Sequence, residues 1–423
     1  MNKILFSILC FCICCSCRDN EIHYSHDLRP TNDFLKYEVD SDVKIPLLVR
    51  TCTSDRELLY FQNGTWPEIL IYDMYDGTLI KRNTFDVEGN NAIKGSFLHG
   101  FMMNGCSQIF ISGMADGHFY ETDTTGYIKK EYRYSESSNE YRPIACFKDN
   151  GDMQVIDGKL YFPQSLNWAL GDEAMENSPL LCSVDLNSGK VERLPVTFPP
   201  ELSSQSIVRG SASSVNLEYK CCFDGQSWVY SFAYMDELMI YNPATSQIEY
   251  KSGKSLYGDD VEMLSFRSAA DDAIQRTVCE SPAYGNILYD NENEVYYRIV
   301  YVPQEIDKNE NALALLRSGR KQFSVMIYDE DFNVIGEHLF QALTYNPNLC
   351  FVSQGDLYIS TNHVMNSDYS DDILCFQKMD LVELREADCF SAEKLEWARK
   401  MVLEKEPKVH SRAIEEMREE MKE

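Results

Sequence analysis

Short apolar runs recur along the middle of the chain in pairs, and a polar turn follows each pair. In the first pair, Glu57–Phe61 precedes Ile69–Asp73, and Asp76 and Gly77 supply the turn. The same order returns in residues 108–111 and 119–123, 159–162 and 181–185, 228–232 and 238–242, 295–299 and 324–329, and 356–359 and 373–376. Runs rich in Tyr, Phe, Ile and Val, with Gly, Asn and Asp between them, predict antiparallel strands joined by tight turns.

The repeat predicts an all-β fold. About six strand pairs, spaced roughly 50 to 70 residues apart, are typical of propeller blades that carry loop insertions. We therefore expect a single β-propeller of about six four-stranded blades over residues 34–390, in which neighbouring blades protect most strand edges. The Tyr-Asp and Thr-Asp pairs of the repeat, such as Tyr72 and Asp73, are interpreted as strand ends followed by turns.

Three insertions interrupt the repeat, at residues 166–179, 252–284 and 303–322. The second contains a helix-like stretch over 261–278, and the third contains the apolar run Ala312–Leu316. Excursions from a rigid β scaffold often carry function, and the alternative is that they only pack on the rim of the blades.

The N-terminus has the pattern of a secretory signal. Lys3 precedes an apolar run over 4–13 that is too short to span a bilayer as a helix. The small residue Ser16 stands just before Cys17, which resembles a lipobox and makes Cys17 the predicted lipidation site, with residues 1–16 removed. Ordinary cleavage to a freely secreted protein is the alternative. Lipidation predicts a cell-envelope protein, with the outer membrane as its expected anchor.

The segments that flank the repeat differ from it in composition. Residues 17–33 are polar and lack periodicity, so we predict a tether there. The sequence leaves open whether a strand near Phe34–Val39 closes the last blade. Residues 391–423 are rich in Glu, Lys, Arg, Ala and Met, which predicts a helical C-terminal appendage.

Charge narrows the class of partner. The formal net charge is -28, and loss of Lys3 with the signal peptide makes it -29. Such a surface repels phosphate backbones and anionic head groups, so we expect no nucleic-acid partner and membrane contact only through the N-terminal lipid. Acyl chains contribute about 0.8 kcal/mol per buried CH₂, which suffices for a firm anchor when several are attached.

Cysteines are spread through the mature chain without a dense framework. Most lie in apolar runs, so we interpret them as small buried residues in preference to disulfides. Besides Cys17, they are Cys52, Cys106, Cys146, Cys182, Cys221, Cys222, Cys279, Cys350, Cys375 and Cys389. No Cys-x-x-Cys pair follows the signal peptide, which argues against a zinc ribbon or a thioredoxin-type site.

No residue set has the spacing of a known catalytic or metal site. The sequence lacks a Gly-x-Ser-x-Gly elbow, a P-loop and a His-Glu-x-x-His signature, and we expect no metal and no cofactor. His23 and His26 have helical ligand spacing but lie in the predicted tether. Acidic loop residues could supply calcium ligands or a glycosidase couple, although a solvated face is the simpler interpretation. The candidate loop acids are Asp172, Asp260 and Asp372.

Taken together, these features resemble a known family. The signal ending at Cys17, the Tyr-rich strand pairs with segments such as Leu70–Asp73 and Met326–Asp329, and the helical C-terminus look like the propeller lipoproteins of gut and oral Bacteroidota collected as domain of unknown function 4221. Those proteins are similar in architecture to TolB-like six-bladed propellers. The resemblance covers nearly the whole mature chain. It implies no functional residue, because the family has no established activity.

Two classes of function fit this sequence. The first is a non-catalytic binding or interaction module for an unknown envelope protein or glycan; a structural subunit of an envelope complex differs from it only in its partner. The second is a propeller hydrolase or lyase acting on glycans, with Asp172, Asp260 or Asp372 converging on an axial funnel. The missing motifs favour binding, whereas carboxylates about 5 to 10 Å apart beside aromatic rings would favour the enzyme.

Overall fold

The computed structural model of the chain divides into two compact units. The larger unit, Asp27–Val382, holds the propeller, and the other comprises Met1–His26 and Glu383–Glu423. The structure describes residues 24–43, 49–53, 56–63, 67–86, 88–89, 91–93, 98–113, 118–133, 151–164, 178–203, 213–258, 261–264 and 271–385.

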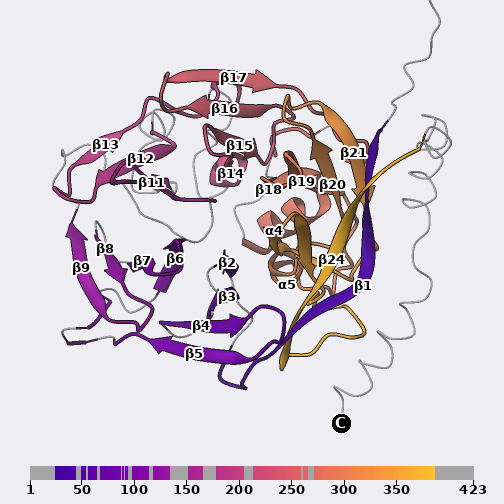
Figure 1. The fold of residues 1–423 in the computed structure, drawn as a ribbon. Coiled ribbons are helices and arrows are strands. Elements are labelled where there is room, and N and C mark those ends of the chain that lie inside the picture. Colours follow the sequence, from indigo (N-terminus) through magenta and orange to yellow (C-terminus); the bar gives the residue numbers. More distant parts are fainter. Residues whose placement is uncertain are drawn as a thin grey trace, which may run out of the picture. The chain divides into compact units, whose positions relative to one another are not determined.

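Six four-stranded sheets, built from the described residues, stand as blades around a central axis (Figure 1). In blades 1 to 5 the strands follow the chain outward from the axis. Blades 1 to 3 consist of β2 (Val49–Thr53), β3 (Glu57–Gln62), β4 (Glu68–Asp73) and β5 (Leu79–Thr84); β6 (Leu98–Asn104), β7 (Gln108–Gly113), β8 (His118–Thr122) and β9 (Ile128–Arg133); and β10 (Gln154–Ile156), β11 (Lys159–Pro163), β12 (Leu181–Asp185) and β13 (Val191–Arg193).

The remaining blades follow the same plan until the last strand. Blades 4 and 5 consist of β14 (Tyr219–Phe223), β15 (Trp228–Phe232), β16 (Leu238–Asn242) and β17 (Gln247–Lys251); and β18 (Ala283–Asp290), β19 (Val295–Tyr301), β20 (Phe323–Tyr328) and β21 (Val334–Leu339). Blade 6 consists of β22 (Asn346–Ser353), β23 (Asp356–Ser360), β24 (Ile373–Glu383) and, outermost, β1 (His26–Glu38). The predicted propeller of six four-stranded blades is confirmed.

The N-terminal strand β1 closes blade 6 against β24. The Val39 N–H donates to the Asp372 carbonyl at 2.9 Å, and the Thr31 hydroxyl donates to the Lys378 carbonyl at 3.1 Å. Going from Thr31 to Val39 along β1, the paired residues go back from Lys378 to Asp372, so the two strands are antiparallel. The question that the sequence left open is thereby answered: the ring is closed by joining the two ends of the propeller.

The prediction of a tether over residues 17–33 is wrong for its second half, because β1 already begins at His26. Leu28 is fully buried in the cluster between blades 5 and 6. The strand was hidden in the sequence because an outermost strand buries few side chains; in β1 these are Leu28, Leu35 and Tyr37. The first part of the predicted tether, residues 17–23, lies outside the described residues.

The middle strands of the blades are buried on both faces. Between blades 1 and 2, for example, Tyr60 and Ile71 pack in one cluster with Phe101 and Ile111. Equivalent clusters fill the other gaps between neighbouring blades in the described part of the ring. Two-sided burial explains why these strands read as nearly continuous apolar runs in the sequence.

The turn between the third and fourth strands has the same construction in blades 1 to 5. An Asp or Asn at the end of the third strand accepts, through its side-chain oxygen, the backbone N–H groups of the turn that follows. These residues are Asp73, Asp123, Asp185, Asn242 and Asp329. Such bonds satisfy amides that a tight turn leaves unpaired. The interpretation of the Tyr-Asp and Thr-Asp pairs as strand ends plus turns is confirmed.

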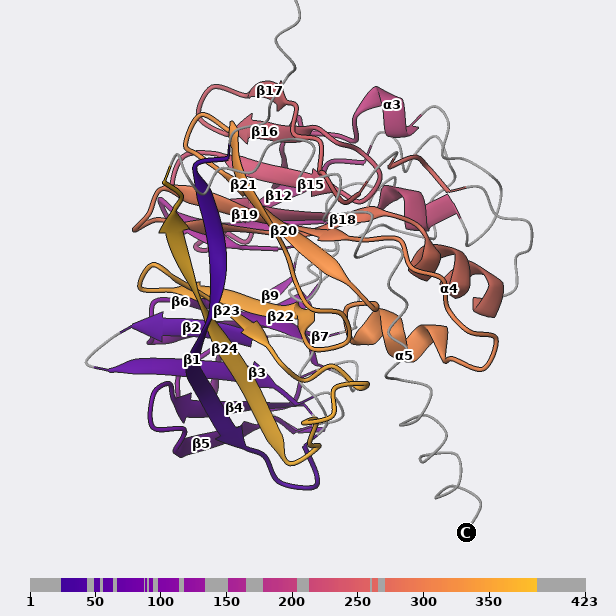
Figure 2. The same cartoon turned by 90° about the vertical axis from the view of Figure 1, so that its right-hand side faces the viewer.

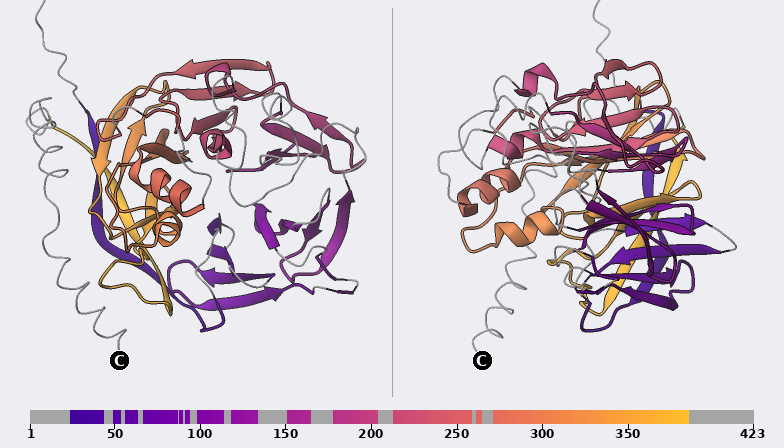
Figure 3. Two further views of the ribbon diagram at one scale, coloured as in Figure 1. Left: turned by 180° about the vertical axis from the view of Figure 1, so that it is seen from behind. Right: turned by 90° about the vertical axis from the view of Figure 1, so that its left-hand side faces the viewer.

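The two faces of the ring are built differently. Because each blade is an antiparallel meander, the turns after its first and third strands lie on one face, which we call the turn face. The connections after second strands and between blades lie on the other, the helix face. The helices lie there (Figure 2), and Figure 3 shows the ring from behind and from the other side. They are α3 (Pro200–Ser203), η1 (Ser213–Leu217), α4 (Asp271–Glu280) and α5 (Ala312–Arg317).

The insertions predicted from the sequence all belong to helix-face connections, and two of them contain described helices. The apolar run of the third insertion forms α5, as expected. In the second insertion the helix is shorter than predicted, because residues 261–264 are not helical. There the Asn216 side chain accepts from the Leu264 N–H at 2.8 Å and donates to its carbonyl at 3.0 Å, which holds the segment in a non-helical conformation. The predicted C-terminal appendage, 391–423, lies outside the described residues.

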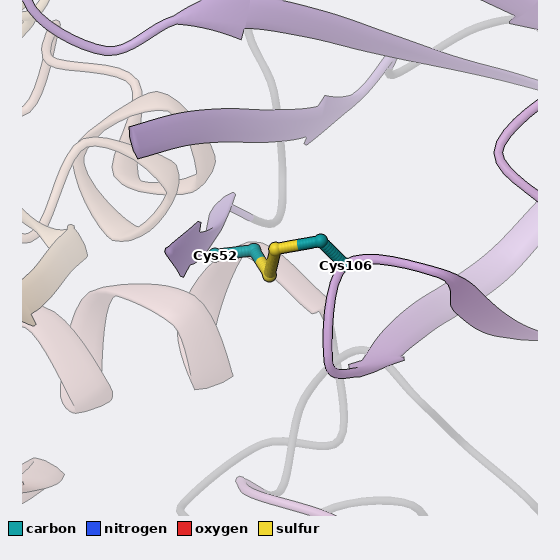
Figure 4. The surroundings of a disulfide bond; sticks show 2 residues. All are labelled: Cys52 and Cys106. Carbon is teal, nitrogen blue, oxygen red and sulfur yellow. A yellow bond between two sulfur atoms is a disulfide. The ribbon is translucent and has the colours of Figure 1, made fainter. Parts of the chain in front are cut away.

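A disulfide between Cys52 on β2 and Cys106 in the turn after β6 links blades 1 and 2 (Figure 4). The expectation that cysteines are small buried residues is wrong for this pair. The two residues are 54 positions apart, and only the ring geometry brings them together. Several other cysteines are buried as expected, among them Cys182, Cys222 and Cys279.

Closure of the ring by β1 predicts a large difference between two positions on that strand. Leu28→Ala should lower the free energy of unfolding by about 2 to 5 kcal/mol, because it empties a fully buried position between blades. Phe34→Ala, at a side chain that is 44% exposed, should cost less than about 1 kcal/mol. Denaturant unfolding of both variants measures the difference, and equal losses would contradict the closure.

Removal of the disulfide should also destabilise the propeller. The Cys52→Ser, Cys106→Ser double variant should lose about 2 to 4 kcal/mol of unfolding free energy, because the bond restricts the unfolded chain. The measurement is urea unfolding of the double variant beside the wild-type protein. Equal stability of the wild-type protein with and without a thiol reductant would count against the bond.

Candidate functional site

Charged and polar side chains gather where the first strands of the blades begin. Each first strand is entered from the helix face, so its opening residues surround the axis there (Figure 1). We call this set the axial mouth. Five of its members lie on a first strand or just before one, and Tyr301 ends the second strand of blade 5. The set consists of Arg50, Asp152, Glu218, Lys220, Tyr301 and Asn348.

Arg50 and Asp152 approach each other across the axis. Arg50 is the second residue of β2 in blade 1, and Asp152 precedes β10 in blade 3. Asp152 nevertheless reaches the first strand of blade 4, because its N–H donates to the Cys221 carbonyl at 3.3 Å and its carboxylate accepts from the Phe223 N–H. Blade 4 stands opposite blade 1 in a six-bladed ring. The two charges consequently interact through the centre of the propeller.

Their depth in the ring perturbs both groups. Burial lowers the pKa of Arg50, and the neighbouring Asp152 partly offsets this. Burial raises the pKa of Asp152, opposed by Arg50 and by the bond from the Phe223 N–H. Both side chains still keep part of their surface exposed. Both groups therefore lie deep in the ring and still keep contact with solvent.

Gly151 makes this position of Asp152 possible. It pairs with Cys221 in an isolated parallel bridge and has a φ of 127°, a value that other residues rarely adopt. A Cβ atom at this position would collide with the Cys221 carbonyl. Only glycine therefore allows the chain to pass so close to β14 and deliver Asp152 to the axis.

A second group of side chains lies on the blade 5 side of the axial mouth. The Tyr301 hydroxyl donates to Asn348 Oδ1 at 2.6 Å, and the Asn348 amide donates to the Leu316 carbonyl at the end of α5 at 2.9 Å. The Arg320 guanidinium lies 4.4 Å from the centre of the Tyr301 ring, a cation–π contact. Helix α5 thus holds Asn348 in place and, through it, Tyr301.

His363 supports this group from the loop between β23 and β24. It is fully buried, its Nε2 lies 2.8 Å from the Arg320 carbonyl, and its Nδ1 accepts from the Met365 N–H at 3.1 Å. These partners require a neutral ring with the proton on Nε2. Burial lowers the pKa of His363 to about 4, although the bond to Arg320 opposes the shift.

The residues predicted from the sequence lie elsewhere or outside the description. Cys17, Asp172 and Asp260 fall outside the described residues. Asp372 is exposed and precedes β24, where its carbonyl accepts from the Val39 N–H. It therefore stands at the outer edge of blade 6, away from the first strands. Within the described ranges, no group of three or more His, Cys, Asp or Glu residues is arranged to hold a metal ion.

Sequence reasoning missed the axial mouth, and the signal that could have found it is ambiguous. Arg50 is a charge at the end of the apolar run 46–49. Arg298 is likewise a charge inside an apolar run, but its role is structural. It is fully buried, and its guanidinium donates to Ser231 Oγ at 2.9 Å and to the Asp236 carbonyl at 2.6 Å, which joins blades 4 and 5.

Comparison with known proteins identifies relatives of the fold. The family model described as "Domain of unknown function (DUF4221)" matches residues 26–339. The chain is similar to a solved member of that family from Bacteroides vulgatus ATCC 8482, with 20% identity, a TM-score of 0.73, and coverage of 85% of this chain and 99% of that one. It is also similar to a structure from Bacteroides fragilis NCTC 9343 named as a "putative exported protein", with 10% identity, a TM-score of 0.52, and coverage of 84% and 95%. At these identities the likeness is one of fold alone. No curated protein matches the chain.

The environment of His363 predicts a pH dependence of stability. Its pKa is about 4 in the folded protein and about 6.5 when exposed, so its contribution is complete above about pH 6.5 and is lost as the pH falls toward 4. The loss should be on the order of 3 kcal/mol. His363→Gln can still donate to the Arg320 carbonyl and does not titrate, so it should lack this part of the acid destabilisation. Denaturant unfolding from pH 4 to 7 compares the two, and identical pH profiles would refute the assignment.

Proposed function

This chain belongs to the DUF4221 family, and from that premise we propose that it is an envelope lipoprotein whose propeller is a non-catalytic binding module with its partner on the helix face. The observation that carries the proposal is the difference between the two faces. The turn face consists of short turns closed by their own Asp and Asn side chains. The helix face carries the helices (Figure 2), and the first strands of the blades begin there. Binding residues concentrate on such connections.

Export and anchoring are supported by separate observations. The signal-peptide pattern ends at Cys17, whose acylation would anchor the mature chain. The disulfide between Cys52 and Cys106 fits an oxidising compartment outside the cytosol. Among the described helices, none has the length and apolar character needed to cross a bilayer.

The direction of β1 suggests how an anchored propeller would be presented. Strand β24 begins after a helix-face connection, so it runs toward the turn face, and its antiparallel neighbour β1 starts at the turn face. Nine residues lie between Cys17 and Asp27, and the ten Cα-to-Cα steps that join them span at most about 36 Å when extended. The chain therefore enters the propeller at the turn-face rim, on the side opposite to the proposed binding face.

A propeller hydrolase or lyase acting on glycans is the second candidate, and one observation favours it. Burial raises the pKa of Asp152 at the axial mouth, and a carboxyl group that keeps its proton can serve as a general acid. Such an enzyme also needs a second carboxylate about 5 to 10 Å away. Glu218 is the other acid of the axial mouth.

A pulldown from gently solubilised envelopes tests the binding role. The lipidated mature chain should recover a partner protein that the Cys17→Ala form does not, because only the anchored form reaches the membrane. Asn348→Lys places a long charged side chain at the axial mouth and should reduce recovery. Tyr127→Ser, at a turn-face side chain that is 63% exposed, is the matched control and should not.

A glycan array run beside the pulldown separates the candidates. Glycan binding with release of new reducing ends, abolished by Asp152→Asn, would replace the binding module with the enzyme. Recovery lost in Tyr127→Ser but kept in Asn348→Lys would overturn the choice of face.

A further inference from the structure

Arg50 and Asp152 form an opposite-charge pair that the fold brings together but does not join. They face each other across the axis, from blade 1 and from the chain lying against blade 4. Neither has an ion-pair partner among the residues that the structure describes. Both keep part of their surface exposed to solvent. A ligand lying between them would therefore meet a cation on one side and a carboxyl group on the other.

The described residues use little of the hydrogen-bonding capacity of this pair. A guanidinium offers five N–H donors, and the bond that Arg50 makes is a long one, 3.5 Å from its Nη1 to the carbonyl of Val49. Asp152 accepts from the Phe223 N–H and has capacity for further donors. A deep charged group normally has its donors and acceptors filled, whereas the described residues leave most of the donors of Arg50 and the acceptor sites of Asp152 open.

Arg298 is an arginine of the same ring whose hydrogen-bond donors are satisfied by neighbouring residues. Its guanidinium donates to Ser231 Oγ at 2.9 Å, to the Asp236 carbonyl at 2.6 Å and to the Met235 carbonyl at 2.8 Å, and it lies 3.5 Å from the centre of the Tyr284 ring. Among the described residues, Arg50 has no comparable set of partners. The comparison separates an arginine that holds two blades together from one that is presented to the axis.

Charge balance at the axial mouth indicates the class of ligand. Arg50 and Lys220 are cations, and Asp152 and Glu218 are acids, with Lys220 Nζ 3.9 Å from a Glu218 carboxylate oxygen. The set is formally neutral within a chain of net charge -28. Electrostatic complementarity therefore favours a ligand that is neutral overall and carries both signs, over a simple anion or cation.

We propose that Arg50 and Asp152 bind a free α-amino acid at the axis of the propeller, with the ligand carboxylate on the Arg50 guanidinium and the ligand ammonium on the Asp152 carboxylate. A guanidinium fork matches a carboxylate through two parallel N–H bonds, and an ammonium supplies the donors that Asp152 can accept. This inference deepens the proposed binding role and rests on it, but it does not depend on lipidation or on the identity of a protein partner.

Binding should also release protons from Asp152. The titratable groups that interact with its carboxyl are Arg50 from β2 and Cys221 and Cys222 from β14. Burial raises the pKa of Asp152, and a bound ammonium would lower it by stabilising the charged form. Proton release on binding is a readout that a purely structural pair would not give.

Isothermal titration of the mature chain in detergent tests the proposal. The probes are α-amino acids of each side-chain class, the matched amines that lack the carboxylate, and the matched N-acetyl amino acids that lack the ammonium. At least one amino acid should bind, and removal of either charged group should weaken binding at least about tenfold. The binding heat should also vary with the ionisation enthalpy of the buffer.

Variants of the two residues test which charged group of the ligand each of them binds. Arg50→Gln and Asp152→Asn should each weaken amino-acid binding at least about tenfold, whereas Arg29→Gln, at an exposed position of β1, should leave it unchanged. If Arg50→Gln does not fold, Arg50→Lys keeps the charge without the planar fork and should still weaken binding.

Three results would overturn the inference: no binding of any amino acid at millimolar concentration, equal binding of the N-acetyl compounds, or binding unchanged in both axial variants. Recovery of a partner in the pulldown without amino-acid binding would overturn this inference alone and leave the proposed function standing.

Discussion

The packing of each blade against both of its neighbours is the interaction on which the rest of the molecule depends. A single four-stranded blade has two apolar faces and could not remain folded alone in water. In the ring, each face is covered by the next blade, as when Phe110 and Phe119 of blade 2 share a cluster with Leu160 and Phe162 of blade 3. The arrangement works only when the circle is complete, because the first and last blades would otherwise expose one face each. Strand β1 meets this requirement by completing blade 6.

The same packing decides which parts of the fold the sequence reveals. The second and third strands of each blade were predicted close to their observed bounds, as for Trp228–Phe232 and Leu238–Asn242, because burial on both faces leaves continuous apolar runs. The fourth strands were missed for the opposite reason. In Gln247–Lys251, four of the five residues are exposed, and the strand is held mainly by backbone hydrogen bonds, which leave little trace in side-chain pattern. First strands such as Gln154–Ile156 are too short to show a pattern.

The candidate site was harder to predict than the fold, for a geometric reason. Arg50 and Asp152 are about a hundred positions apart, and their meeting depends on the number of blades and on a glycine that lets the chain cross to blade 4. The local periodicity of the sequence predicts neither the number of blades nor this crossing of the chain. Isolated charges in apolar runs do stand out, but Arg298 shows that they can equally be internal braces between blades. Only the count of satisfied donors separates the two roles.

The closing strand also determines the order in which the molecule can be made. Residues of β1 leave the ribosome first, yet their partners in β24 are more than 330 positions later in the chain. A nascent chain therefore cannot complete its last blade until nearly all of it has been synthesised, and contacts of such long range form slowly. If the chain is exported unfolded, as proposed above, late closure would be an advantage, because the chain would stay competent for translocation until both ends of the propeller are on the same side.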